Sequence, residues 1–213
     1  MSLAVRRLQL GPMANFVYLV ADEASKTFAA VDPAWDVSAV FAEAAREGWT
    51  LAAVVLTHNH FDHSDGLPDV LRRSDVPVYV HAEDASAVRG EGRRIVETGD
   101  GSALGLGDSR LEFVHTPGHT PGSQCLRAGE RLLTGDTLFI GACGRVDLPG
   151  SDPRRMYASL RKLGALPDDL LVMPGHAYGP RPAARLGDEK RENPYLAGAL
   201  RLPLERFLKE VDP

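Results

Sequence analysis

Five of the seven histidines in this chain lie in three short segments, and each segment directly follows a stretch with the pattern of a β-strand. The first segment carries His-x-His-x-Asp-His immediately after the apolar run 51–56, and Gly66 closes it. Loops that follow strands are where a rigid scaffold presents reactive side chains. The arrangement therefore favours a metal site over a solvated loop that happens to be rich in histidine.

The spacing of these residues defines a set of candidate metal ligands. His58 and His60 are two positions apart, so they point the same way on an extended backbone. Asp136 in a Gly-Asp pair and His176 in a Gly-His pair would be unremarkable alone, but here they accompany the first segment. Imidazole and carboxylate together suit zinc, iron, manganese or similar divalent ions. The candidate ligands are His58, His60, Asp62, His63, His119, Asp136 and His176.

Apolar patterns typical of strands and of helices are mixed in both halves of the chain. Strands are predicted at residues 4–10, 15–22, 27–32, 51–56, 76–81, 111–116, 123–127, 131–134 and 170–173. Helices are predicted over 37–45 with a stop at Gly48, after Gly66 through Leu71, around 156–163 and at 204–211. No linker or charge block divides the chain, so we expect one domain over residues 1–213, an α/β protein whose sheets are covered by helices.

Composition excludes several classes of partner. The net charge of −5 gives no basic field for nucleic acid. No apolar run reaches transmembrane length and no signal peptide is recognisable, so we expect a soluble cytoplasmic protein without a membrane partner. Cys125 and Cys143 form no C-x-x-C pair and are expected to be buried free thiols. The expected partner is a small-molecule substrate.

Taken together, the motifs resemble the metallo-β-lactamase superfamily, in particular its glyoxalase II-like and persulfide dioxygenase-like branches. The resemblance extends from Asp32-Pro33 to Asn193-Pro194 and is carried by residues 57–66, 116–122, 135–136 and 175–176. It implies a four-layer αβ/βα sandwich, with two sheets face to face, helices outside, and a metal site at one sheet edge.

The resemblance also implies a dinuclear site. One ion would be held by His58, His60 and His119, the second by Asp62, His63 and His176, and Asp136 would bridge the two. The expected cofactors are two divalent ions, zinc first, with iron or manganese as alternatives. His81 and His115 match no ligand of the family and are expected to be structural.

The activity implied first is hydrolysis of a thioester, as in hydroxyacylglutathione hydrolases. Two ions close together activate a water and polarise the carbonyl under attack, and a thiolate leaves readily. Asp62 would be the catalytic residue that orients this water while also binding metal. Arg145 and Tyr178 are candidate substrate contacts, since family members hold glutathione near these positions. The segment after His176 is too short for the helical C-terminal domain of full-length glyoxalase II enzymes.

Other activities remain open on the sequence alone. A persulfide dioxygenase would use one Fe(II) held by His58, His119 and Asp136, a facial triad of two histidines and one carboxylate, on a substrate such as a glutathione persulfide. A non-catalytic metal-binding protein is the third alternative. Antibiotic hydrolysis is disfavoured, because the commonest β-lactamase branch has cysteine where this chain has Asp136.

Overall fold

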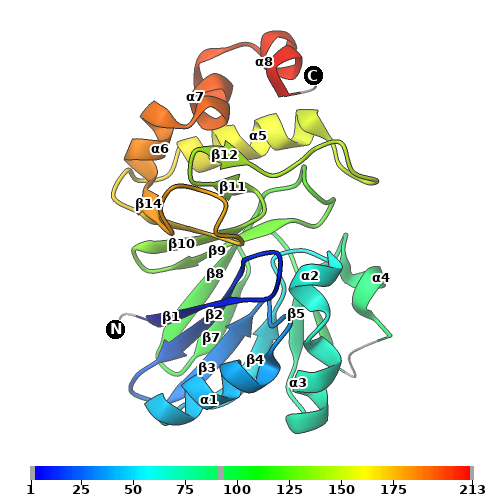
Figure 1. Ribbon diagram of the computed structural model, residues 1–213, viewed down its shortest axis with the longest axis vertical. Helices are drawn as coiled ribbons and strands as arrows, with labels where there is room; N and C mark the ends of the chain where they lie inside the picture. The colour runs from blue at the N-terminus through cyan, green and yellow to red at the C-terminus, as the bar shows by residue number, and fades with distance from the viewer. Residues whose placement is uncertain (1–2, 91–93, 212–213) are drawn as a thin grey trace.

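Two six-stranded sheets lie face to face in the computed structural model, which describes residues 3–90 and 94–211 (Figure 1). The first sheet has the order β1 (Ala4–Leu10), β2 (Asn15–Asp22), β3 (Thr27–Val31), β4 (Thr50–Val55), β5 (Val78–His81) and β6 (Ile95–Thr98). The second has the order β14 (Ala184–Arg185), β13 (Leu171–Pro174), β10 (Arg131–Gly135), β9 (Gln124–Ala128), β8 (Ser109–His115) and β7 (Ala103–Leu106). A small hairpin adds β11 (Leu138–Phe139) and β12 (Ala142–Cys143).

Helices cover the outer face of each sheet, which confirms the four-layer sandwich. Helices α1 (Val37–Glu47), α3 (Leu67–Arg73) and α4 (Ala85–Val88) pack on the first sheet. Helices α5 (Pro153–Gly164), α6 (Leu186–Glu192), α7 (Pro194–Arg201) and α8 (Leu204–Val211) lie on the side of the second sheet, at the opposite end of the view in Figure 1. The short α2 (Phe61–Ser64) lies within the first histidine segment.

Strand β2 shows why the sequence gives two sheets with a core on each side. All eight of its residues are buried, which is the pattern of a strand covered on both faces. Phe16, Tyr18 and Val20 point into the core between the sheets, while Val17 and Leu19 pack on the side of α1. Successive side chains of this one strand therefore pack alternately into two separate cores.

The nine predicted strands and four predicted helices are confirmed, with ends that differ by a few residues. The structure adds β6, β7, β11, β12, β14 and helices α2, α4, α6 and α7, which the apolar patterns did not predict. These elements are short, and β7 alternates buried and exposed positions over only four residues. Among the helices that the structure describes, none combines the length and apolar character needed to cross a bilayer.

Neither cysteine has the properties of a nucleophile. Both cysteines are free thiols, as predicted; Cys125 is buried, whereas Cys143 is only half-buried and differs from the expectation in that respect. Burial raises the pKa of the Cys125 thiol to about 11 and that of Cys143 to about 12. Because the thiolate is the reactive form, both thiols are inert at neutral pH.

Candidate metal centre

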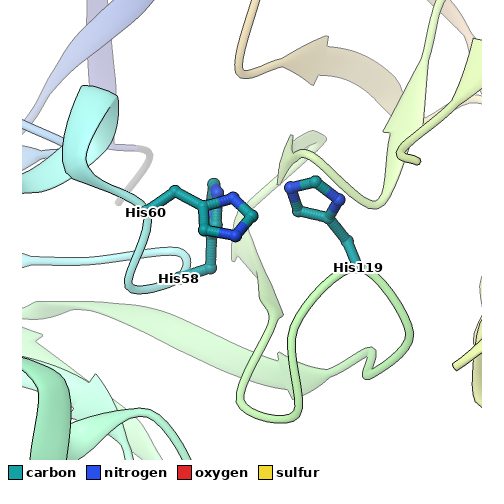
Figure 2. Close-up of side chains that lie close together, drawn as sticks. All are labelled: His58, His60 and His119. Carbon is teal, nitrogen blue, oxygen red and sulfur yellow. The ribbon is translucent and has the colours of Figure 1, made fainter. Parts of the chain in front are cut away.

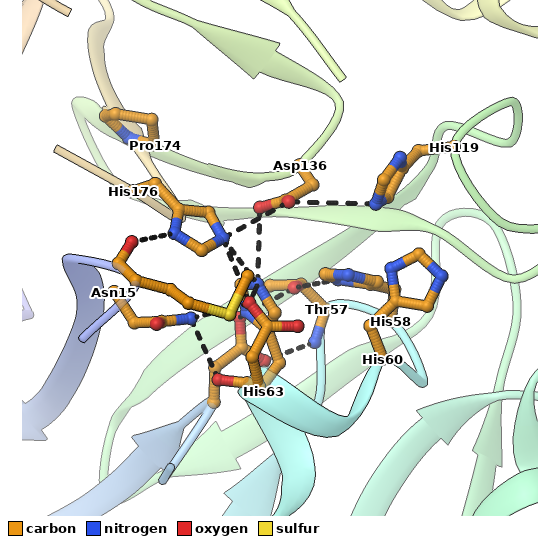
Figure 3. A network of polar contacts seen from close by, with 12 residues as sticks. Asn15, Thr57, His58, His60, His63, His119, Asp136, Pro174 and His176 are labelled. Atoms are coloured by element: carbon orange, nitrogen blue, oxygen red, sulfur yellow. Dashed lines mark hydrogen bonds and ion pairs between the residues drawn. The ribbon is translucent and has the colours of Figure 1, made fainter. Parts of the chain in front are cut away.

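Four segments that each follow a strand converge at one edge of the sandwich. They come after β4, β8, β10 and β13, the first from one sheet and the others from the second. Hydrogen bonds join the sheets there: the backbone N–H of Gln124 donates to Thr57 at 2.9 Å, and the Tyr18 hydroxyl donates to the Pro174 carbonyl at 2.6 Å. All seven candidate ligands lie at this edge, and all except Asp62 are labelled in Figure 3.

The first group consists of three imidazoles from two loops. His58, His60 and His119 each offer a ring nitrogen, and these nitrogens lie within 4.8 Å of one another. Figure 2 shows the rings of His58 and His60, from the loop after β4, on one side and that of His119, from the loop after β8, on the other. His58 and His119 are buried and His60 is half-buried, so the group opens to solvent on the His60 side.

The second group combines one carboxylate with two imidazoles. Asp62, His63 and His176 also meet the 4.8 Å condition. The Nε2 atoms of His63 and His176 are 3.1 Å apart, and the Oδ2 atom of Asp62 lies 3.3 Å from Nε2 of His176. All three residues are buried.

Asp136 lies between the two groups. Its Oδ2 atom is 3.6 Å from Nε2 of His119 in the first group and 3.3 Å from Nε2 of His176 in the second. Its Oδ1 atom is 3.4 Å from Nε2 of His63. Dashed lines in Figure 3 trace these contacts on both sides of the carboxylate. One carboxylate therefore reaches both groups.

The histidine rings are held so that Nε2 points inward. His119 Nδ1 donates to the Arg145 carbonyl at 2.8 Å and His176 Nδ1 to the Met13 carbonyl at 2.9 Å. His63 Nδ1 lies 3.0 Å from Oδ2 of Asp32. Partners that only accept fix the proton on Nδ1, which leaves the Nε2 lone pair free for a metal.

A second, independent observation indicates that these residues fit a metal ion. Among the residues that the structure describes, the buried atoms His58 Nε2, His119 Nε2 and Asp136 Oδ1 have no hydrogen-bond partner. Buried polar atoms in folded proteins almost always have one. An ion with tetrahedral bonds of about 2.1 Å keeps its ligand atoms roughly 3.4 Å apart, close to the separations measured around Asp136.

Charge is distributed unevenly between the two groups. Burial, followed by the neighbouring His63 and His119 rings, holds the pKa of His58 well below its usual value. For His176, burial opposes the charged ring, but hydrogen bonds to Asp136 and Asp62 outweigh it and raise the pKa to about 10. The carboxylates of Asp62 and Asp136 thus favour positive charge beside His176, and a divalent ion would supply such a charge.

Two residues that the sequence did not suggest hold this centre in place. The Asn15 side-chain amide donates to the carbonyl and to Oδ2 of Asp62, at 2.8 and 3.0 Å. Trp35 Nε1 in turn donates to Oδ1 of Asn15 at 2.8 Å. Asp32 accepts from the Thr57 N–H and hydroxyl at 2.7 and 2.6 Å, besides its contact with His63. An acidic residue at the end of the predicted strand 27–32 was a usable sequence signal for Asp32, whereas nothing in the local sequence indicates a role for Asn15.

His81, Glu83 and His115 also lie close together, but their polar atoms are already engaged. The two rings stack in parallel with centroids 3.7 Å apart, and His115 Nε2 donates to the Pro121 carbonyl at 3.0 Å. Glu83 forms two hydrogen bonds with Arg155, at 2.9 and 3.0 Å. Stacked rings do not aim two lone pairs at one point, so this geometry fits the structural role predicted for both histidines.

The structure places the two candidate substrate contacts differently. The Tyr178 ring stacks on His176 with centroids 4.4 Å apart, and 57% of the residue is exposed. The Arg145 guanidinium makes two hydrogen bonds to exposed Asp147, at 2.9 and 2.7 Å, while its carbonyl holds His119. Tyr178 therefore borders the centre directly, and Arg145 reaches it through its backbone.

Fold and side chains together define the class: a four-layer α/β sandwich with two groups of metal-ligand residues at one edge. A family model, the Metallo-beta-lactamase superfamily, matches residues 10–176. This chain belongs to the metallo-β-lactamase superfamily.

Relatives within the family carry different names. A hydroxyacylglutathione hydrolase of Rhodospirillum rubrum is 34% identical, over 85% of this chain and 82% of that protein. The crystal structure of ETHE1 from Myxococcus xanthus is similar with a TM-score of 0.87 and 30% identity, over 98% of this chain and 90% of that one. The structure of TTHA1623 in a di-iron-bound form has a TM-score of 0.78 and 32% identity, over 89% of this chain and 99% of that one.

Proposed function

We propose that this protein is a metal-dependent hydrolase with two divalent ions, acting on a thioester in the manner of hydroxyacylglutathione hydrolases. The observation that carries the proposal is the position of Asp136, whose carboxylate reaches His119 in one group and His63 and His176 in the other. A bridging carboxylate is what two neighbouring cations require, because it offsets the repulsion between them.

Each group is assigned one ion. His58, His60 and His119 would hold the first ion. Asp62, His63 and His176 would hold the second, and Asp136 would be shared between them. When bound, two such ions supply an activated water and polarise the carbonyl under attack. Asp62 accepts a hydrogen bond from Asn15, which fixes the direction of its carboxylate and leaves it able to orient the attacking water. Zinc is the first candidate ion, with iron or manganese as alternatives.

The choice of a thioester has two supports. The relative from Rhodospirillum rubrum is named a hydroxyacylglutathione hydrolase. In addition, neither cysteine is activated as a nucleophile, since both thiols have raised pKa values. A thiolate leaves with little help from a general acid, so the residues present suffice for this reaction.

We expect Arg145→Ala to raise KM about tenfold with kcat little changed, if the guanidinium binds a remote carboxylate equally in ground and transition states. Asp147→Asn is the matched variant, because it releases Arg145 from its ion pair. It should lower KM. Steady-state kinetics on a glutathione thioester measures both, and unchanged KM values in the two variants would leave Arg145 as a surface ion pair.

A persulfide dioxygenase is the second candidate, favoured by the similarity to ETHE1 over nearly the whole chain. In that case one Fe(II) is held by His58, His119 and Asp136, and the second group stays without metal. All three residues are in place, so the ligands alone do not separate the candidates.

Parallel assays of the purified protein separate the two functions. Release of thiol from a glutathione thioester is followed with a thiol reagent, and oxygen uptake with glutathione persulfide is followed at an electrode. We expect thioester hydrolysis that stops on chelation and returns with zinc. Oxygen uptake without hydrolysis would replace the first candidate by the second.

A further inference from the structure

Asp84 is a buried carboxylate that neither the ligand motifs nor the proposed reaction uses. Only 1% of its surface is exposed, and it occupies the N-cap position of α4. An aspartate at this position ordinarily accepts a hydrogen bond from its own helix. Here the side chain makes no such bond, so its orientation is set by something other than the helix.

The carboxylate instead accepts hydrogen bonds from the two loops that carry the first group of imidazoles. Its Oδ2 atom accepts from the Asn59 N–H at 3.1 Å and from the Thr120 hydroxyl at 2.7 Å. Its Oδ1 atom accepts from the Gly122 N–H at 2.7 Å. Asn59 lies between His58 and His60, and Thr120 directly follows His119.

Asp84 lies very close to the loop that carries His119. A Cβ atom on Gly122 would lie 2.5 Å from Cγ of Asp84, so only glycine allows the carboxylate this near. The same loop is held from its other side by His115, whose ring donates to the Pro121 carbonyl. Loop and carboxylate therefore form one packed unit.

Two buried carboxylates outside the ligand set, Asp32 and Asp84, support the centre. Asp32 contacts His63 of the second group and, through Thr57, also the start of the segment that carries His58. The hydrogen bonds of Asp84 go to residues next to His58, His60 and His119. The distance from His58 and His60 to His119 depends on how two loops from different sheets are joined. Asp84 joins them with one side chain.

We propose that Asp84 is a positioning residue that fixes the spacing of His58, His60 and His119 and thereby sets the metal affinity of the first site. This inference rests on the metal centre proposed above. Asparagine at this position turns one acceptor oxygen into a donor that faces N–H or O–H groups, so it separates the loops while keeping the size of the side chain. Residues that hold metal ligands in place contribute about 10–100-fold to affinity.

The test measures each site alone by titrating zinc against a competing chelator. The His176→Ala background retains the first site, and the His60→Ala/His119→Ala background retains the second. Adding Asp84→Asn should weaken zinc binding about 10–100-fold in the first background and leave the second unchanged. Thr120→Val, which removes only one of the three donors, should give a smaller loss of about fivefold in the first background alone.

Asp22→Asn is the matched control. Asp22 is equally buried and accepts comparable hydrogen bonds, from the Ser109 hydroxyl at 2.7 Å and the Ser25 N–H at 2.8 Å, outside the metal centre. It should lower the melting temperature without changing zinc affinity in either background.

Equal affinities with and without Asp84→Asn in the first background, or equal losses in both backgrounds, would overturn the inference while sparing the metal centre. Failure of the parent His176→Ala protein to bind zinc would remove the proposed centre and the inference with it. If Asp84→Asn does not fold, the Thr120→Val result decides: an unchanged first-site affinity overturns the proposal.

Discussion

Asp136→Asn should lower thioester hydrolysis by about a hundredfold or more while the protein remains folded. The substitution keeps the shape of the side chain but removes the charge that lies within 3.6 Å of ring nitrogens from both groups. In the proposed centre, two cations would then face each other without the bridging anion between them. The experiment measures kcat and bound metal on the same preparations, with circular dichroism to establish folding. Near-wild-type turnover would remove the metal-centre assignment altogether.

His176→Ala should reduce the bound metal from about two ions per chain to about one and lower hydrolysis roughly a hundredfold. The second group loses one of its two imidazoles, while His58, His60 and His119 keep the first ion. The tyrosine that stacks on this ring, Tyr178, also loses its support. Metal analysis after gel filtration, together with the thioester assay, gives both quantities.

His81→Ala provides the comparison for His176→Ala. It also removes a buried imidazole, but one whose ring stacks on His115 outside the centre. We expect its metal content to equal that of the wild type. A dioxygenase would behave differently under His176→Ala: it would keep its single iron, and oxygen uptake would fall only about 10–100-fold. A variant that retains two ions would contradict the assignment of His176.

The fold could be predicted to the extent that its elements have long, uniform patterns. The nearly continuous apolar run of β2 is visible because both of its faces are buried, and the helical stripe of α5 is visible because one full face is buried. Strand β7 and the hairpin β11–β12 bury too few residues for a pattern, and their position depends on pairing with distant strands. The Asn193-Pro194 cap of α7 was a usable local signal, since its side chain accepts from two N–H groups of that helix.

The candidate ligands could be predicted because each one stands beside a recognisable strand end. Their supports could not, since those contacts are made across the fold. Asn15 lies 47 positions from Asp62, and Asp84 lies 36 positions from Thr120. For Arg145 the sequence predicts a substrate contact, which stays a prediction. The sequence did not predict its ion pair with Asp147, because the pairing of exposed side chains depends on local geometry.

The most direct test of a dinuclear hydrolase is the metal content of the wild-type protein purified without added metal. Inductively coupled plasma mass spectrometry gives the identity and number of ions per chain, and thioester hydrolysis is measured on the same sample. We expect about two divalent ions per chain, and hydrolysis that rises with occupancy of the second. One iron per chain, with oxygen uptake on glutathione persulfide and no thioester hydrolysis, would contradict the account.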